Sequence, residues 1–498
     1  MSEPTPERAR DLGKRFLLGS LYMGAGNWIT YALNFAIQIA IARILGPSEI
    51  GFYAFVFAIN EFLNIVGALS LGIALIQSRE ESQSLYDTAL AICAVLALIG
   101  LLAAAGVAPF LWEYRSPRAA WFLLVMALAR VMLLLAQVPQ ARLERQLRYG
   151  RVSLMGVITG NVPNLGALGF ALAGFGAWSL VFRDFGVAAL VLLLATVWSG
   201  YRFRARIEGE SARRLMNYAR PMFLARSAEI VIDRVDRATI GALLGDTATG
   251  LYHQARFVAE TGNVATRAVS QLSLNLYSRL QDQSQRLARA YGLVNYFLAR
   301  LTFLGGSVLL LFPNETVRLL LGEEWAGVAP MLRWLGLYGA LLPVFENVKV
   351  LYYAAGDVRW VVRIRIIQLA LFAPAVLAAC FAEKLAAVAA ALLGTLLLGL
   401  AVSQPLTRRV LGRSVPVLRA PSLILAATVA VFLVLGAADL LEPVPWALRP
   451  FLPPVLFSAL LVAVERSTLL RELRYLRSQL RGDAGGEAQA AVDGAESG

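Results

Sequence analysis

The sequence predicts an all-α polytopic membrane protein, and three observations lead to this fold class. The chain of 498 residues is 58% hydrophobic and only 16% charged, with a mean hydropathy of +0.63, which is more apolar than soluble domains of this length. Apolar stretches of at least 18 residues recur along it, and each could cross a hydrocarbon core of roughly 30 Å. Basic residues gather in alternate connections between these stretches.

Fourteen stretches meet the length and composition of a transmembrane helix. The first is too long for the apolar part of a signal peptide and lacks a small-residue cleavage site, so we expect it to be retained. The stretches are residues 16–43, 50–77, 87–111, 119–140, 151–173, 176–200, 220–243, 250–277, 291–312, 327–353, 361–382, 385–405, 421–438 and 447–464.

The basic residues predict the orientation of the chain. Arginines concentrate in the N-terminal segment, in the connections around Arg142–Arg151, Arg202–Arg220 and Arg359–Arg365, and after residue 465, whereas the connections on the other side carry few. By the positive-inside rule, both termini are expected in the cytoplasm. This distribution accounts for the net charge of +13, so no nucleic-acid partner is predicted.

An internal repeat predicts two similar halves. The stretch that begins at Leu45 matches the stretch that begins at Leu244, at a constant offset of 199 residues. The offset spans six helices, an even number, so both copies should run in the same direction, as in transporters built from parallel repeats. A chance match of turn residues is the alternative. The identical pairs are Leu45 and Leu244, Gly46 and Gly245, Gly51 and Gly250, Tyr53 and Tyr252, Glu61 and Glu260, and Asn64 and Asn263.

This repeat predicts the domain organisation. We expect two six-helix lobes followed by two further helices and a basic amphipathic helix, with a disordered tail rich in Gly and Ala. The predicted units are a cytoplasmic N-terminus at 1–15, an N-lobe at 16–200, a cytoplasmic linker at 201–219, a C-lobe at 220–405, the two added helices at 421–464, and the basic helix with the tail at 465–498.

Polar residues follow helical spacing inside three of the predicted spans. In the eighth span the steps between them are 4, 3, 4 and 4 residues, which places them on one face of a helix. These residues are Arg256, Glu260, Asn263, Arg267 and Gln271 in the eighth span, Asn27, Tyr31, Asn34 and Gln38 in the first, and Arg226, Asp233 and Arg237 in the seventh, with Glu229, Arg234 and Asp236 nearby.

Charged side chains inside a membrane are expected to face a helix-bundle interior or a wet cavity. One interpretation is that neighbours such as Arg256 and Glu260 simply neutralise each other as internal salt bridges. Arg267 and Arg130, however, have no acidic residue one turn away. This excess of guanidinium groups predicts a cavity for an anionic substrate, with Asn64 and Asn263 in its polar lining.

The acidic residues Glu61, Glu260, Asp233 and Asp236 are predicted to face the same cavity. Glu260 has Arg256 one turn away, whereas the repeat position that matches Arg256 is occupied by Phe57. Glu61 therefore lacks a local cation and is our candidate for ion coupling. Partnership with a cavity arginine and a latch between the lobes are the alternatives for both glutamates.

The sequence indicates no catalytic, metal or cofactor site. Cys93 and Cys380 lie inside predicted spans and suggest neither a disulfide nor a metal centre. The single histidine, His253, has no companions that would complete a metal site. The chain has no Walker motif, so direct ATP coupling is not expected.

Several motifs, taken in order, resemble the bacterial polysaccharide-unit flippases of the Wzx type, which belong to the multidrug, oligosaccharidyl-lipid and polysaccharide (MOP) exporter superfamily. The resemblance covers roughly residues 15 to 465. The motifs are "LGPSEIGFY" (45–53), "LERQLRYGRVSLMGVI" (143–158), "ALAGFGAWSLV" (171–181), "YSRLQDQSQRLARAY" (277–291) and "LLGEEWAGVAPMLRWL" (320–335).

The resemblance implies two lobes in a V shape and a flippase in the bacterial inner membrane, coupled to an ion gradient. It also implies a substrate: an undecaprenyl-diphosphate-linked oligosaccharide, moved to the periplasmic leaflet by alternating access. Polysaccharide polymerases and glycosyltransferases are the implied partners. Drug exporters of the superfamily commonly bind a cation through an acidic residue of the first helix, where this chain has Asn27 and Asn34.

Three alternative functions were weighed. A lipid II flippase and a small-molecule exporter of the same superfamily remain open, because the motifs favour neither. A membrane polymerase or ligase is disfavoured, because the predicted outward connections are short, the longest being about Pro313 to Ala326. The predicted pyrophosphate-binding residues are Arg226, Arg237, Arg256, Arg267, Arg130 and Asn263.

Overall fold

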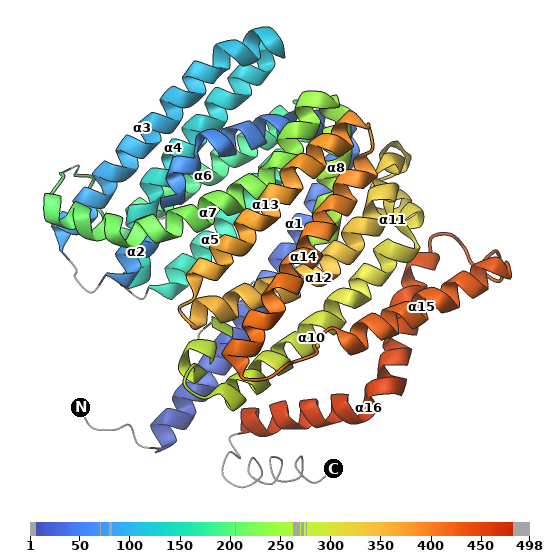
Figure 1. Cartoon of the computed structure of the whole chain (residues 1–498). Coiled ribbons are helices and arrows are strands. Elements are labelled where there is room, and N and C mark those ends of the chain that lie inside the picture. The colour runs from blue at the N-terminus through green and yellow to red at the C-terminus, as the bar shows by residue number, and fades with distance from the viewer. Residues whose placement is uncertain are drawn as a thin grey trace.

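The computed structural model describes residues 6–481 apart from 70, 79–81, 147, 205, 262–268, 270–272 and 275, and describes the side chains of its first helix from Thr30 onward. These residues form helices and connecting turns (Figure 1). The first half holds α1 (Pro6–Leu63), η1 (Ile65–Leu69), α2 (Leu71–Gln77), α3 (Gln83–Tyr114), α4 (Pro117–Arg145), α5 (Tyr149–Leu172) and α6 (Trp178–Ser199).

The second half begins after a short linker. It holds α7 (Gly209–Leu243), α8 (Gly245–Glu260), α10 (Ser284–Leu311), α11 (Pro313–Leu320), η3 (Glu323–Val328), α12 (Ala329–Ala354), α13 (Val358–Phe381) and α14 (Leu385–Leu411). After these come α15 (Arg419–Ala437), η4 (Arg449–Phe451) and α16 (Leu452–Arg481). α16 pairs with α15, and both pack on α10.

The repeated Leu-Gly pair breaks the chain in the same way in both halves. Gly46 adopts φ +73° inside α1, and Gly245 adopts φ +84° where α7 gives way to α8. Left-handed backbone of this kind ends a helix and is accessible mainly to glycine. After Gly46, Pro47 is suited to the first turn of the next helix, because it has no N–H to leave unpaired.

Other helix ends also follow from local sequence. The hydroxyl of Ser82 accepts the Leu85 N–H at the start of α3, and Ser116 accepts the Ala119 N–H at the start of α4. Gly200, at φ +61°, ends α6. These signals place the turns of the bundle where the apolar stretches stop.

Eleven helices in the described part are long and apolar enough to cross a membrane, so the protein is a multi-pass membrane protein with an all-α fold. The predicted count of fourteen remains a prediction. The first two predicted spans merge into one helix across the break at Gly46, while α7 is too rich in charge and α8, with 16 residues, too short to qualify. Helix α1 begins at Pro6, inside the segment predicted as an N-terminus, and the tail from 482 lies outside the described residues.

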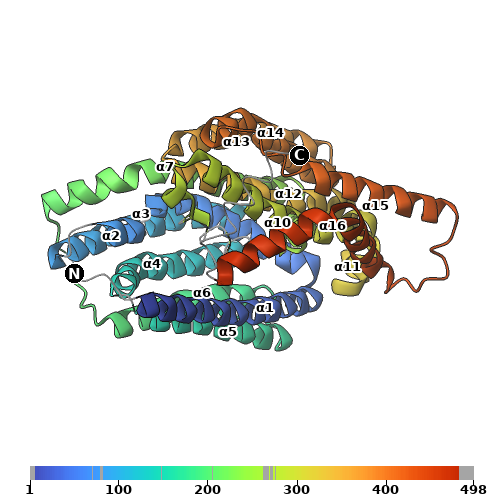
Figure 2. The same cartoon turned by 90° about the horizontal axis from the view of Figure 1, so that it is seen from below.

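The two halves lie side by side (Figures 1 and 2). Seen from below, α13 and α14 form one side of the molecule and α1, α5 and α6 the opposite side. Helix α1 packs along α8, and α7 contacts α1, α2 and α3 in the first half as well as α8 and α13 in the second. The repeated helices therefore form much of the contact between the halves.

Candidate functional site

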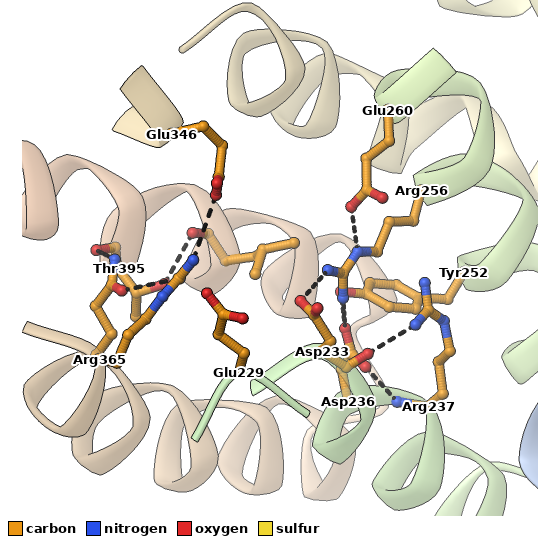
Figure 3. A network of polar contacts seen from close by, with 12 residues as sticks. Glu229, Asp233, Asp236, Arg237, Tyr252, Arg256, Glu260, Glu346, Arg365 and Thr395 are labelled. Atoms are coloured by element: carbon orange, nitrogen blue, oxygen red, sulfur yellow. Dashed lines mark hydrogen bonds and ion pairs between the residues drawn. The ribbon is translucent and has the colours of Figure 1, made fainter. Parts of the chain in front are cut away.

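A cavity of about 810 Å³ lies in the second half, enclosed by α7, α8, α12, α13 and α14. This volume is within the range of roughly 300–1,000 Å³ that ligand sites usually have. The sequence led us to expect a cavity between the two halves, but every residue that lines this one comes from the second half. Its walls carry two groups of charged side chains, shown in Figure 3.

The first group, which we call the Arg256 cluster, consists of Asp233, Asp236, Tyr252, Arg256 and Glu260. The guanidinium of Arg256 donates to all three carboxylates: Nε to Glu260 at 2.5 Å, Nη1 to Asp236 at 2.7 Å and Nη2 to Asp233 at 3.0 Å. The Tyr252 hydroxyl also donates to Asp236, at 2.8 Å. Arg256 is therefore fully occupied by the protein itself, and it is not available to bind substrate phosphates.

Arg237 and Arg234 lie beside this cluster on α7 and line the cavity. Arg237 is buried; its Nη1 donates to the backbone carbonyl of Asp233 at 2.7 Å, and its Nε has no hydrogen-bond partner among the described residues. Arg234 lies over the ring of Phe57 in α1, 5.0 Å from the ring centre. Within the described residues neither guanidinium forms an ion pair, so these two cations remain able to bind an anion.

The second group, the Arg365 cluster, consists of Glu229, Glu346, Lys349, Arg365 and Gln368. Lys349 Nζ lies 3.1 Å from Glu229 and 2.7 Å from Glu346. Arg365 lies 3.3 Å from Glu346 and donates to the Gln368 side-chain oxygen at 3.2 Å. Figure 3 shows Glu229 between the Arg365 side and the Arg256 side of the cavity. Both cations in this group are therefore held by protein carboxylates.

The structure brings several predicted site residues together. Arg226, Asp233, Arg237, Arg256 and Glu260 line the cavity, and Asp236 lies directly behind Arg256. The expected local pairs of Arg256 with Glu260 and of Arg226 with Glu229 are present, the latter at 3.0 Å. Asp233 pairs with Arg256 rather than with Arg237. Asn263 and Arg267, which were central to the predicted cationic stripe, lie outside the described residues.

Glu61 and Arg130 lie in the first half, away from this cavity, and they pair with each other at 3.1 Å. The expectation that Glu61 has no nearby cation is wrong, because α4 supplies one from a distant part of the chain. The reasoning that assigned ion coupling to Glu61 therefore loses its premise. Next to Glu61, Asn64 is buried, and its amide donates to Asn60 at 2.8 Å and 3.0 Å.

The predicted polar stripe of the first span does not line the cavity either. Gln38 accepts a hydrogen bond from Arg183 at 3.2 Å, next to the Arg183–Asp184 ion pair. Tyr31 is exposed, and the side-chain oxygen of Asn34 is buried without a partner. The side chain of Asn27 lies outside the described residues.

The Arg365 cluster was the main omission of the sequence analysis. Arg365 was assigned to a cytoplasmic connection, together with Arg359 and Arg363, whereas α13 begins at Val358 and carries it into the cavity wall. The spacing of Arg365 and Gln368, three residues apart on one helix face, was an available signal. Tyr338 and Tyr353 also line the cavity and were not predicted.

No group of three metal-binding side chains occurs in the part of the chain that the structure describes. Both cysteines are buried and unpaired. The polar groups that line the cavity are ion-paired side chains, an amide and tyrosine hydroxyls, and such groups can bind a polar ligand.

Comparison with known proteins agrees with this architecture. A curated relative, the succinoglycan biosynthesis transport protein ExoT of Rhizobium meliloti (strain 1021), is 28% identical over 322 residues. The alignment spans 63% of this chain and 64% of the relative.

Solved structures show the same fold. A lipid II flippase, MurJ, in an inward closed conformation matches with a TM-score of 0.72 at 13% identity, over 90% of this chain and all of that one. An inward-facing multidrug resistance MATE transporter of the MOP superfamily matches with a TM-score of 0.60 at 12% identity, over 76% of this chain and 94% of that one. A family model described as polysaccharide biosynthesis protein matches residues 40–330, more than half of the sequence. The chain therefore belongs to the polysaccharide biosynthesis protein family.

Proposed function

We propose that the protein is a flippase that moves an undecaprenyl-diphosphate-linked oligosaccharide from the cytoplasmic to the periplasmic leaflet of the bacterial inner membrane. The observation that carries this proposal is the charged cavity of about 810 Å³ inside an apolar helical bundle, in a chain of the polysaccharide biosynthesis family. A polar head group needs such a cavity to cross the hydrocarbon core, while its lipid tail can remain among the tails of the bilayer.

The relatives support a transporter over an enzyme. The curated relative is named a succinoglycan biosynthesis transport protein, and the solved structures of the same fold are named as a flippase and as a multidrug resistance transporter. The similarity to MurJ is a similarity of fold, and it does not indicate that lipid II is the substrate. The family match favours a polysaccharide unit, and polymerases and glycosyltransferases are the proposed partners.

The diphosphate of the substrate would bind at Arg234 and Arg237. These two guanidinium groups line the cavity without ion-pair partners in the described residues, and planar guanidinium groups bind phosphate oxygens in pairs. Arg234 also contacts Phe57 in α1, so a ligand there would lie where the two halves meet. Transport would then proceed by alternating access, with both termini cytoplasmic and an ion gradient as the energy source.

The test is flipping in proteoliposomes that contain lipid-linked oligosaccharide extracted from the producing bacterium. We expect Arg237→Ala to reduce the initial rate at least tenfold and Arg237→Lys to recover part of it, because lysine keeps the charge and loses the fork. Arg234→Ala, at a site outside the buried ion pairs, provides a second variant. Arg318→Ala, which alters an exposed arginine paired with Glu323, is the matched control and should flip normally.

Two results would contradict the proposal. If the parent protein flips lipid II and leaves the lipid-linked oligosaccharide in place, the lipid II alternative is correct. If Arg234→Ala and Arg237→Ala both flip at the parental rate while folded, the assignment of the diphosphate to these residues is wrong.

A further inference from the structure

We propose that the Arg365 cluster binds the sugar part of the substrate, separately from the diphosphate; this inference rests on the proposed function and assigns one end of the same cavity. The distinction comes from which charged atoms face the cavity. In this cluster the cations lie deep in the cavity wall, whereas a carboxylate faces the cavity. The charge on the atoms that a ligand contacts first therefore differs from the summed charge of the cluster.

Exposure of the side chains shows this arrangement. The side chains of Lys349 and Arg365 are 9% and 12% exposed, whereas that of their shared partner Glu346 is 36% exposed. The same holds in the Arg256 cluster, where Arg256 is 4% exposed and Asp233 is 55% exposed. Within each cluster a ligand therefore meets acceptor oxygens before it meets the buried cations, while the exposed cation beside the Arg365 cluster, Arg226, is paired with Glu229.

A diphosphate is a poor ligand for such a surface. It would approach Glu346 first, and like charges repel strongly in a partly desolvated cavity. To reach Lys349 or Arg365 it would have to separate them from Glu229 and Glu346, which would break the ion pairs that hold these two cations. The cluster therefore favours a ligand without negative charge.

Sugar hydroxyl groups fit the same atoms. Each hydroxyl is both a donor and an acceptor, so it can donate to the exposed Glu346 without breaking the ion pairs behind it. The Tyr353 hydroxyl also lines the cavity and forms no hydrogen bond with another described residue, so it is free to bind a ligand. Leu342 and Leu396 supply apolar patches between these polar groups, as in many small-molecule sites.

The two ends of the cavity thus divide the substrate between them. Arg234 and Arg237 present cations without ion-pair partners in the described part, and the Arg365 cluster presents a carboxylate and a phenol. The first suits the diphosphate that every substrate on this carrier lipid shares. The second suits the sugars, and it would therefore discriminate between different oligosaccharides on the same carrier.

The experiment compares two ligands on the purified full-length protein in nanodiscs. One is undecaprenyl diphosphate without sugar, and the other is the lipid-linked oligosaccharide extracted from the producing bacterium. We expect Glu346→Gln to weaken binding of the oligosaccharide about tenfold, as for loss of a hydrogen bond to a charged group. Binding of bare undecaprenyl diphosphate should stay unchanged, because its phosphates are assigned to Arg234 and Arg237 at the other end of the cavity.

Tyr353→Phe is the second variant, because it removes a cavity hydroxyl and leaves every ion pair in place. It should also weaken oligosaccharide binding selectively, by a smaller factor. The matched control is Glu323→Gln, the same chemical change at an exposed ion pair outside the cavity, which should alter neither affinity. Thermal melting of each variant shows whether it is folded.

The outcomes separate the alternatives. If neither variant changes the ratio of the two affinities, the cluster is an internal ion-pair network only, and the inference is overturned. Tighter binding of bare undecaprenyl diphosphate to Glu346→Gln would mean that the phosphates reach Lys349 and Arg365, which also overturns the inference. If the parent protein binds neither ligand, the proposed function itself fails.

Discussion

Arg256 shows how a charge can lie deep in a membrane protein without serving the substrate. Its guanidinium contacts three carboxylates, and one of them, Asp236, is fully buried and also receives the Tyr252 hydroxyl. The backbone N–H of Arg237 donates to Asp236 as well, at 2.7 Å. The hydrogen bonds and ion pairs of this small network offset the free energy that its charged groups lose when they are removed from water. A charged group can be buried stably only under this condition.

We therefore expect Asp236→Asn to destabilise the protein more than Tyr252→Phe does. The first change breaks a buried charge pair, which typically costs about 3–5 kcal/mol, and the second removes one hydrogen bond, with a net cost of about 1 kcal/mol. Thermal unfolding in detergent measures both. Equal melting temperatures for the two variants would show that Arg256 is adequately paired without Asp236.

The spacing of residues along one helix predicts some of the ion pairs and cannot predict the others. The pairs Arg256–Glu260 and Arg226–Glu229 lie within one helical turn, where sequence separation alone indicates contact. The pair Glu61–Arg130 joins α1 to α4, and the pair of Lys349 with Glu229 joins α12 to α7. Such partners are set by helix packing, which no spacing along one helix can reveal.

At the scale of elements, the linker between the halves is fastened to the first half. Tyr201 is buried, and its hydroxyl donates to Asp87 at 3.0 Å. The Glu208 N–H donates to the Thr88 hydroxyl at 3.1 Å, and its carboxylate accepts the hydroxyls of Ser84 and Ser211. The linker thus ties the beginning of α3 to the beginning of α7.

The Glu208 carboxylate accepts hydrogen bonds from two serine hydroxyls. The bond from Ser84, and after it the bond from Ser211, lowers the pKa of Glu208 below its usual value of 4.5. A carboxylate whose pKa is lower in the folded protein stabilises the fold above its unfolded-state pKa, and it loses this effect as the pH falls through the folded-state pKa. A spin label at Arg204 should therefore report an ordered linker from pH 7 down to about pH 5, and a mobile one in stronger acid.

Glu208→Gln provides the comparison. In this variant the label should be more mobile at pH 7 and should respond little to acid, because the titrating group is gone. Glu210→Gln, which alters an exposed carboxylate in the first turn of α7, is the control and should resemble the parent. A parental response in Glu208→Gln would assign the acid transition to another group.

At the scale of the whole molecule, the repeated glycines hold the two halves against each other. A Cβ atom on Gly51 would lie 1.7 Å from the Asp246 carbonyl oxygen, and one on Gly250 would lie 1.9 Å from the Pro47 carbonyl oxygen. Asp246 and Pro47 are themselves equivalent positions of the repeat, so the contact is reciprocal. Nearby, Arg115 in the first half forms an ion pair with Asp246 in the second.

Gly250→Ala should therefore push the halves apart at this end. We expect cysteines introduced at Arg115 and Asp246, in a background without Cys93 and Cys380, to be cross-linked several-fold more slowly by a short bifunctional reagent when Gly250→Ala is present. Gly106→Ala, at a glycine with open space around it, is the control. If Gly250→Ala leaves the cross-linking rate unchanged, the backbone around Pro47 accommodates the added methyl group without separation of the halves.

The sequence predicts the fold class well, because length, hydropathy and the repeat act over hundreds of residues. The all-α membrane architecture is confirmed by the structure and by the comparisons. The count of fourteen spans remains a prediction, since the charges of α7 lower its hydropathy below that of an ordinary span. The position of the cavity within one half could not be predicted, because the repeat favoured a site shared by both.

The two repeat-equivalent glutamates have mechanical consequences that differ between the halves. Glu61 reaches across to Arg130 on α4, whereas Glu260 binds Arg256 on its own helix. Helix α12 packs on α8 and supplies no ion-pair partner to Glu260 within the described residues. In the first half, sliding of these helices past each other must break an ion pair, so that half is stiff. In the second half, α12 can shift relative to α8 without breaking such a bond, and its ion pairs tie it to α7 and α13 instead.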